Sequence, residues 1–174
     1  WVYGYELHIV SCADSELPIA LTVTTGKRNG GPLFPQLLRK ASDFHISMRI
    51  VGADGNYHSA ENHLEAHRLG ACTVIPLQSR QHGKPRSLAQ RLRLDPVIKR
   101  GSEMYQRLKR KRQSIERVFS RLKSHFNLDK LRGRGLANVK PHAFLSLTSM
   151  LIYALTAAKR GLGNLARSPT RLTA

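Results

Sequence analysis

Three charged residues with helical spacing stand in the most basic part of the chain: Arg112, Glu116 and Lys123. If this segment is one helix, spacings of four and seven residues place the three side chains on one face, with a carboxylate between two cations. Carboxylates bind hard metal ions, and cations bind phosphate oxygens. The pattern predicts a helix that handles phosphate, with a plain ion pair between Glu116 and Arg112 or Arg117 as the alternative.

A second acidic residue, Asp54, comes directly after an apolar segment in the sequence RIVGADGNY, residues 49–57. We expect a strand to stop here and a Gly-Asn turn to begin, which places the carboxylate at the edge of a sheet. Asp before Gly is also common in turns, so Asp54 alone could serve the turn only. Taken together, Asp54 and Glu116 predict a two-metal site that cuts or joins DNA.

The charge distribution indicates a polyanionic partner. The net charge is +18, and residues 80–134 hold 18 basic and 4 acidic side chains, whereas residues 1–79 hold 6 and 7. Such a basic band favours nucleic acid, through counterion release at the phosphates. The segment KLRGR, residues 130–134, predicts backbone contacts by Arg132 and Arg134, because a glycine between them permits close approach.

Other candidate sites are weaker. Cys12 and Cys72 lack metal-type spacing and are expected to be buried, reduced thiols. His63 and His67 are four residues apart, but the order of a zinc HExxH motif is absent, so we expect a solvated helix face.

The elements expected to position these residues follow from periodicity and capping signals. We expect a hairpin of two strands, a short helix beginning at Pro32, a buried central strand, a helix capped by Ser59, a fourth strand, a long basic helix capped by Ser102, and a final apolar helix. The expected ranges are 3–12 and 19–25 for the hairpin, 47–53 and 71–77 for the later strands, 78–94 for a mobile loop, 102–126 for the basic helix and 142–158 for the last helix. This order predicts an α/β fold.

These segments resemble the catalytic core of a DDE transposase from a bacterial insertion sequence. YGYELHIVSCADSELPIALTVTTG is similar to the second and third strands of that family, RIVGADGNYHS to the strand that ends in its second Asp, and IERVFSRLK to its terminal Glu helix. The family pattern Tyr-x2-Arg-x3-Glu-x6-Lys is matched by Arg112, Glu116 and Lys123, with Lys109 in the place of Tyr. The resemblance implies a ribonuclease-H-like mixed sheet with flanking helices.

The resemblance also implies functional roles. Asp54 and Glu116 would be the second and third metal-binding, catalytic carboxylates for Mg²⁺ or Mn²⁺, and Lys109, Arg112 and Lys123 would contact DNA. The family's first Asp lies on a strand that precedes YGYELH and has no counterpart here. We therefore expect a catalytic domain over residues 1–160 that is truncated at its amino end, a loose tail over 161–174, and little activity in the isolated chain.

The expected activity is DNA transposition, by metal-dependent phosphodiester cleavage and strand transfer. Its partners would be double-stranded transposon ends and target DNA, with a possible homodimer in a synaptic complex and a cytoplasmic, nucleoid-associated location. The apolar run 143–158 is short for a bilayer crossing, so no membrane partner is expected. A non-catalytic basic DNA-binding remnant of a transposase and a basic RNA-binding protein remain as alternatives.

Overall fold

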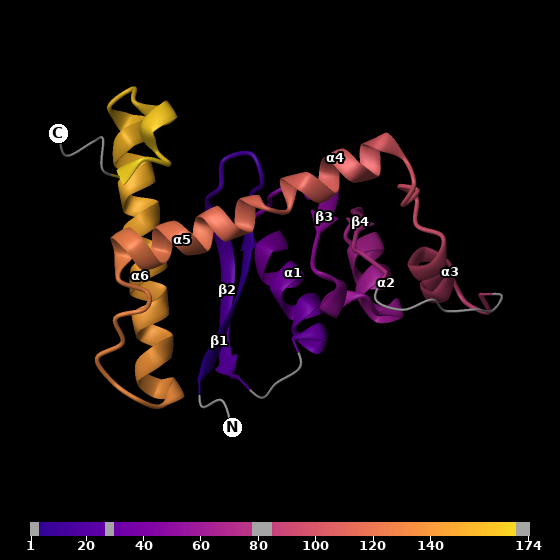
Figure 1. Cartoon of the computed structure of the whole chain (residues 1–174), viewed down its shortest axis with the longest axis horizontal. Helices are drawn as coiled ribbons and strands as arrows, with labels where there is room; N and C mark the ends of the chain where they lie inside the picture. The colour runs from indigo at the N-terminus through magenta and orange to yellow at the C-terminus, as the bar shows by residue number, and fades with distance from the viewer. Residues whose placement is uncertain (1–3, 27–29, 78–84, 170–174) are drawn as a thin grey trace. The chain divides into compact units, whose positions relative to one another are not determined.

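The computed structural model describes residues 4–26, 30–77 and 85–169, and Figure 1 shows the order of their elements along the chain. The chain divides into two compact units, Trp1–Arg28 with Ser114–Ala174 (unit 1) and Asn29–Gln113 (unit 2), each of which is described by itself. Unit 1 contains β1 (Tyr5–Ser11), β2 (Pro18–Thr25), α5 (Ser114–Phe126), α6 (Leu136–Lys159) and η3 (Gly163–Leu165). Unit 2 contains η1 (Gly31–Leu33), α1 (Phe34–Ser42), β3 (Ile50–Gly52), η2 (Gly55–Tyr57), α2 (Ala60–Arg68), β4 (Cys72–Val74), α3 (Leu88–Leu94) and α4 (Glu103–Lys111).

The predicted hairpin at the start of the chain is confirmed. β1 and β2 pair antiparallel from Tyr5 opposite Thr25, with a register shift between Val10 and Ser11. Most residues of β2 are buried, and the strand packs on α6. Leu21 and Val23 of β2 form a core with residues of that helix, which are Val139, Ala143 and Leu147.

The apolar face of α5 packs against α6 within unit 1. Val118 and Leu122 are almost fully buried against Met150 of α6. Ile115 and Phe126 lie half-buried at the margin of this cluster. The buried face of α5 therefore holds the helix on the core and leaves its opposite face for solvent or ligand.

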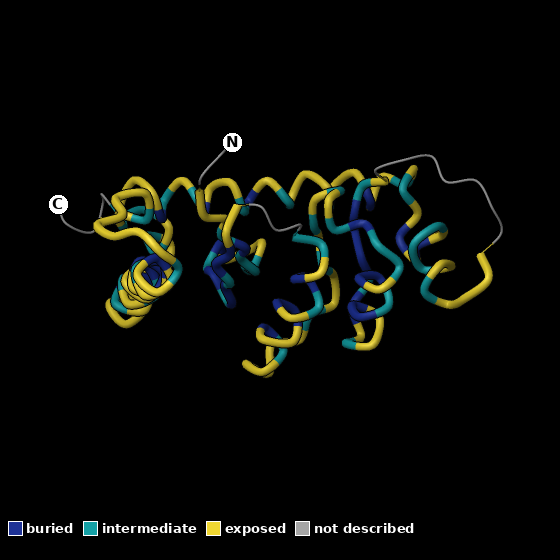
Figure 2. Tube along the Cα trace, turned by 90° about the horizontal axis from the view of Figure 1, so that it is seen from below, coloured by how far each residue is buried: buried dark blue, intermediate teal, exposed yellow. Residues whose placement is uncertain are grey.

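The last helix, α6, is longer than predicted. It begins at Leu136, directly after Gly135, whose φ of 87° turns the chain into the helix. Pro141 lies inside α6, where it removes a single hydrogen bond close to the start, and the helix continues through it. Figure 2 shows buried residues on only part of its surface, and Leu145 and Ile152 are among its exposed apolar side chains.

The length of α6 bears on whether this helix could cross a membrane. Within the described part of the chain, Leu136–Lys159 is the one helix long and apolar enough to cross a bilayer by length and composition. A single helix of this kind is weak evidence, since a core helix of a soluble protein also meets the test. The helix is thus longer than the apolar run 143–158, but it is not a clear membrane span.

In unit 2 the predicted helix starts are confirmed. The side chains of Ser59 and Ser102 accept hydrogen bonds from the backbone N–H groups of Asn62 and Tyr105, which caps α2 and α4. Gly70, with a φ of 76°, follows α2 as expected. On α1 the apolar side is buried, namely Phe34, Leu37, Leu38 and Ala41.

The strands of unit 2 are shorter than predicted. β3 and β4 form a parallel pair of three residues each, from Ile50 opposite Cys72 to Gly52 opposite Val74. One further bond joins Ala53 N to Val74 O at 3.3 Å. The ladder ends there because Pro76, which follows soon after, has no N–H to donate. β3 is largely exposed, which differs from the central, buried strand that was expected.

The predicted loop 78–94 contains a helix. Residues 78–84 lie outside the described part, but α3 occupies Leu88–Leu94. Ser87 Oγ accepts from Gln90 N at 3.3 Å, and Gln90 Oε1 accepts from Arg86 N at 2.7 Å. These two hydrogen bonds resemble a capping box. The Ser-x-x-Gln spacing in the sequence was the signal that could have indicated the start of α3. Asp95 is the C-cap of α3.

The fold is α/β, as predicted. In the described residues it contains an antiparallel strand pair in unit 1 and a parallel pair in unit 2, rather than one continuous mixed sheet. After α6, the hydroxyl of Tyr153 donates to the carbonyls of Leu165 and Ser168 at 3.2 and 2.9 Å, so the segment after Gly161 contacts the helix.

Candidate functional site

Asp54 lies just after the end of β3, where the chain enters a turn, as the sequence predicts. It forms the N-cap of η2, and its Oδ1 accepts a hydrogen bond from Gly55 N at 2.7 Å. Tyr57 N donates to Asp54 O at 3.0 Å, which closes the turn. The side chain is exposed, so the turn orients one carboxylate oxygen and the rest of the group faces solvent.

Glu116 and Lys123 share one face of α5. They are seven residues apart within an unbroken helix, which is nearly two full turns, and both are exposed. Glu116 lies in the first turn, where the helix dipole favours a negative charge. The predicted pairing of an acid and a base on one helix face is therefore confirmed for these two residues.

Arg112 does not belong to that helix, which corrects the predicted three-residue face. α4 ends at Lys111 and α5 begins at Ser114. Arg112 N and Gln113 N donate to carbonyls only three residues back, at 3.2 and 3.1 Å, so the chain makes a turn instead of continuing the helix. The break coincides with the boundary between the two units, which sequence periodicity did not reveal.

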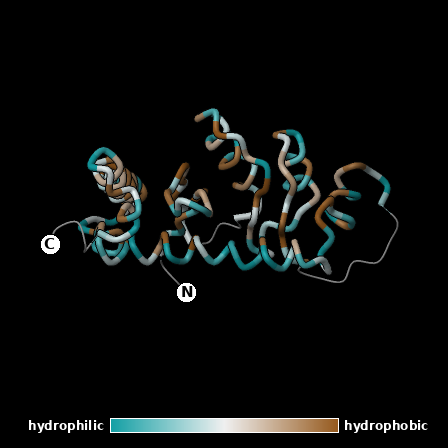
Figure 3. The backbone as a smooth tube through the Cα atoms, turned by 90° about the horizontal axis from the view of Figure 1, so that it is seen from above, coloured by the Kyte–Doolittle hydropathy of each residue, from teal (hydrophilic) through white to brown (hydrophobic). Residues whose placement is uncertain are grey.

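A basic hollow of about 230 Å³ lies at the end of α4 in unit 2. It is lined by Gln106, Lys109, Arg110, Arg112 and Gln113. Arg112 Nε is buried and has no hydrogen-bond partner among the described residues. Figure 3 shows the hydrophilic character of α4, whose sequence is EMYQRLKRK. Cations and amides without a carboxylate suit an anion such as a phosphate.

A second hollow, of about 330 Å³, lies beside the predicted KLRGR segment in unit 1. It is lined by Leu131, Arg132, Gly133, Asn138 and His142. A Cβ on Gly133 would meet the Asn138 side chain at 3.2 Å, and Asn138 Nδ2 donates to Arg134 O at 2.8 Å. The absence of a side chain at position 133 therefore lets Asn138 close the loop, and Arg132 and Arg134 remain exposed.

The two predicted metal-binding carboxylates lie in different units. Asp54 belongs to unit 2 and Glu116 to unit 1, so their pairing stays a prediction. Within the described ranges no group of three or more His, Cys, Asp or Glu residues could hold a metal ion. Neither carboxylate forms an ion pair with any described residue, in contrast to Glu16, Glu65 and Asp95. Both groups thus keep oxygen atoms available for a hard metal ion.

The histidines of α2 are arranged differently from the expectation. His63 is 1% exposed, and its Nδ1 lies 2.6 Å from Thr73 Oγ1, whereas His67 is exposed. Burial lowers the pKa of His63 to about 3, and the nearby ring of His58 and the guanidinium groups of Arg93 and Arg100 act in the same direction. His63 is therefore a neutral core residue, and the predicted solvated face applies to His67 alone.

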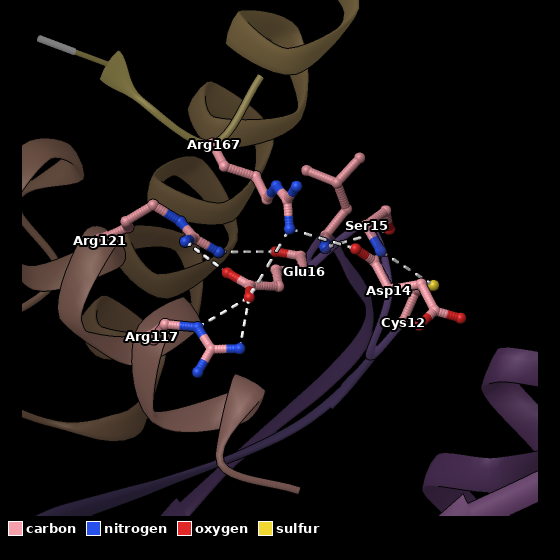
Figure 4. A network of polar contacts seen from close by, with 8 residues as sticks. Cys12, Asp14, Ser15, Glu16, Arg117, Arg121 and Arg167 are labelled. Atoms are coloured by element: carbon pink, nitrogen blue, oxygen red, sulfur yellow. Dashed lines mark hydrogen bonds and ion pairs between the residues drawn. The ribbon is translucent and has the colours of Figure 1, made fainter. Parts of the chain in front are cut away.

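Sequence reasoning missed one polar cluster. Glu16, in the turn between β1 and β2, is 5% exposed and contacts Arg117 and Arg121 of α5, as Figure 4 shows. The spacing of the two arginines, one helical turn apart, was readable, but their partner lies about 100 residues earlier in the chain. The two cysteines also differ from expectation, since both are free but only half-buried.

An α/β chain with exposed acids at a strand end and a helix start, and with basic hollows nearby in sequence, has the features of a nucleic-acid enzyme. A family model described as the transposase DDE domain matches residues 1–152. The chain belongs to this family, which acts on DNA in transposition, has polynucleotidyl transferase activity and generally uses divalent metals. No curated protein and no solved structure matches the chain.

Proposed function

We propose that this chain binds transposon-end DNA and supports metal-dependent phosphodiester cleavage and strand transfer in a ribonuclease-H-like catalytic site. One observation carries the proposal: Asp54 and Glu116 are exposed and without an ion pair to a described residue, although the chain has a net charge of +18. By contrast, Glu16, Glu65 and Asp95 are each paired with arginine or lysine. The oxygens of Asp54 and Glu116 are therefore available to a cationic ligand.

The donor set fits a hard divalent ion. Asp54 and Glu116 supply carboxylate oxygens, which Mg²⁺ and Mn²⁺ prefer, and no described sulfur or imidazole cluster competes for a softer metal. Two such ions would activate the attacking oxygen and stabilise the leaving oxygen of the phosphodiester. The family's first Asp has no assigned counterpart in this sequence.

The cations have separate roles in this proposal. Lys123 would bind a DNA phosphate beside Glu116, since both project from one face of α5. Lys109 and Arg112 would bind a phosphate in the hollow at the end of α4. Arg132 and Arg134 would contact the DNA backbone at the second hollow. Such contacts position the duplex and carry no base specificity.

The biological setting follows from this activity. The substrates would be the double-stranded ends of a bacterial insertion sequence and the target DNA. A homodimer could hold two ends in one synaptic complex. A protein that acts on chromosomal DNA in this way would be cytoplasmic and associated with the nucleoid.

Titration with Mn²⁺ tests the metal site without requiring turnover. We would compare the wild type with Asp54→Asn and Glu116→Gln, using Asp43→Asn and Glu103→Gln as controls, since these acids are also exposed and Glu103 likewise lies in the first turn of a helix. Substitution of residues that hydrogen-bond to metal ligands lowers metal affinity by about 10-fold or more. Substitution of a ligand itself should lower the affinity at least as much. Equal affinity in all five proteins would contradict the proposal.

The same experiment separates the alternative of a non-catalytic DNA-binding remnant. Such a protein would bind transposon-end DNA equally well with and without Mn²⁺, and Asp54→Asn would leave both affinities unchanged. The proposed function instead predicts Mn²⁺ binding that depends on Asp54 and Glu116.

A further inference from the structure

Glu16 occupies a backbone conformation that a glutamate rarely adopts. Its φ is 54°, in the left-handed region, and its N–H donates to Cys12 O at 2.9 Å in the turn between β1 and β2. Glycine or asparagine fits such a position with less strain. A glutamate at this place therefore suggests that its side chain has a role outside the turn.

The carboxylate of Glu16 is held at both oxygens by α5. Arg117 Nε donates to Oε1 at 2.7 Å, and Arg121 Nη1 donates to Oε2 at 2.7 Å. Arg121 Nη2 also donates to the Glu16 backbone carbonyl at 3.0 Å, so one residue of the turn receives bonds from two residues of the helix (Figure 4). Charge-assisted bonds of this kind are directional and short, which fixes the position of the donors.

The charges in this cluster are strongly coupled. Burial alone would raise the pKa of the Glu16 carboxyl, but hydrogen bonds from Arg117 and Arg121 outweigh burial and hold the pKa below its ordinary value. Arg121 is 12% exposed, and its Nε has no partner among the described residues. Glu16 is thus the counter-charge for a guanidinium that has little access to water.

The two contacts fix the rotation of α5 about its axis. Arg117 and Arg121 are one turn apart on the same side of the helix, and Glu116 precedes Arg117 by one residue. The apolar contacts of Val118 and Leu122 with Met150 turn one face of α5 toward the core, but the hydrophobic effect is non-directional and tolerates small rotations of the helix. Two charged contacts to one carboxylate restrict these rotations.

We infer that Glu16 is a positioning residue, which sets the rotation of α5 and thereby the direction in which Glu116 faces. The inference rests on the proposed function for its consequence, which is that Glu116 binds metal. A Glu16 that served only to stabilise unit 1 would make the same contacts, so the test must separate positioning from stability.

Two arginines provide a matched pair for this test. Arg117 and Arg167 are both about half exposed and both contact Glu16, but Arg117 belongs to α5 and Arg167 follows η3, with a looser contact of 3.8 Å. Because each is partly solvated, Arg117→Gln and Arg167→Gln should both leave the chain folded. Glu16→Gln removes the negative charge that all three arginines contact.

Mn²⁺ affinity and backbone hydrogen exchange of the full chain would be measured for the wild type, these three variants and Glu116→Gln. We expect Arg117→Gln and Glu16→Gln to speed the exchange of α5 amides by about 10-fold or more, with β1 and β2 changed much less, since local opening frees the helix alone. We also expect both variants to weaken Mn²⁺ binding toward the value of Glu116→Gln, while Arg167→Gln matches the wild type.

The inference is overturned if α5, β1 and β2 exchange faster to the same extent, because Glu16 would then stabilise the unit as a whole. It is also overturned if Glu116→Gln weakens Mn²⁺ binding but Glu16→Gln and Arg117→Gln do not. If Glu116→Gln has no effect on Mn²⁺, the proposed metal site fails, and the exchange data alone decide whether Glu16 sets the rotation of α5.

Discussion

Arg112 and Glu116 are four residues apart in the chain but belong to different helical segments, because Arg112 caps the end of α4 and Glu116 lies in the first turn of α5. A continuous helix would place them one turn apart on a single face. The turn at Arg112 and Gln113 removes that relationship and leaves Lys123 as the cation that shares a face with Glu116.

The break between α4 and α5 predicts that glycine substitutions at two exposed glutamines differ in their effect on stability. Gln106 lies inside α4 and Gln113 in the turn. Glycine in a helix interior is about 1 kcal/mol less favourable than alanine, so Gln106→Gly should lower the free energy of unfolding by about 0.5 kcal/mol or more. Gln113→Gly should change it by about 0.2 kcal/mol or less, as measured by denaturant titration. Equal losses would mean that α4 and α5 form one helix.

The two basic hollows predict phosphate contacts, whose number can be obtained from the salt dependence of DNA binding. Each cation that contacts a phosphate contributes about 0.9 to the slope of the logarithm of the binding constant against the logarithm of salt concentration. Lys109→Gln and Arg132→Gln should each reduce the slope by about that amount, uniformly across DNA sequences. Arg68→Gln, which removes an exposed cation at the end of α2, is the control. An unchanged slope for Lys109→Gln and Arg132→Gln would exclude these contacts.

The capping serine of α3 tests a helix that sequence patterns did not predict. Ser87 Oγ accepts from Gln90 N, so Ser87→Ala should lower the free energy of unfolding by about 1 kcal/mol. Ser124→Ala, at an exposed position inside α5, should be neutral or slightly stabilising, because alanine has the higher helix propensity. If the two variants behave alike in denaturant titration, α3 does not begin at this cap.

The buried His63 predicts a loss of stability in mild acid. Burial lowers the pKa of His63 to about 3 in the folded chain, below the ordinary value of 6.5. The unfolded chain therefore binds a proton as the pH falls below about 6.5 while folded His63 stays neutral, so the free energy of unfolding decreases by about 1.4 kcal/mol per pH unit toward pH 3. The contribution is fully present above pH 6.5.

Measurements between pH 6.5 and 5 isolate the contribution of the buried histidines, His63 and also His58, whose pKa burial lowers as well. The lowered pKa values of Glu16 and Glu65 act only below about 4.5, the ordinary value for glutamate. His63→Gln should flatten the pH dependence in the upper window, although it also lowers stability at neutral pH by removing the contact with Thr73. His67→Gln, on the exposed side of α2, should leave the slope intact. The same slope in His63→Gln and the wild type would contradict the assignment.

Local sequence signals determined the elements that place the candidate site. Alternating residues produced the β1 and β2 hairpin, Ser59 and Ser102 marked the starts of α2 and α4, and Asp54 was placed at the end of a strand before a turn. These features depend on hydrogen bonds and burial within a few residues of the chain. Composition likewise determined the basic character of the middle segment.

The tertiary structure alone decided the relationships between distant segments. It showed the burial of His63 against Thr73, the shortness of β3 and β4, the turn between α4 and α5, and the contact of Glu16 with Arg117 across 101 residues. No periodicity records such pairs, because each residue's local pattern is compatible with many partners. Packing selects the partner, since burying Glu16 requires a cation that only the folded chain brings close.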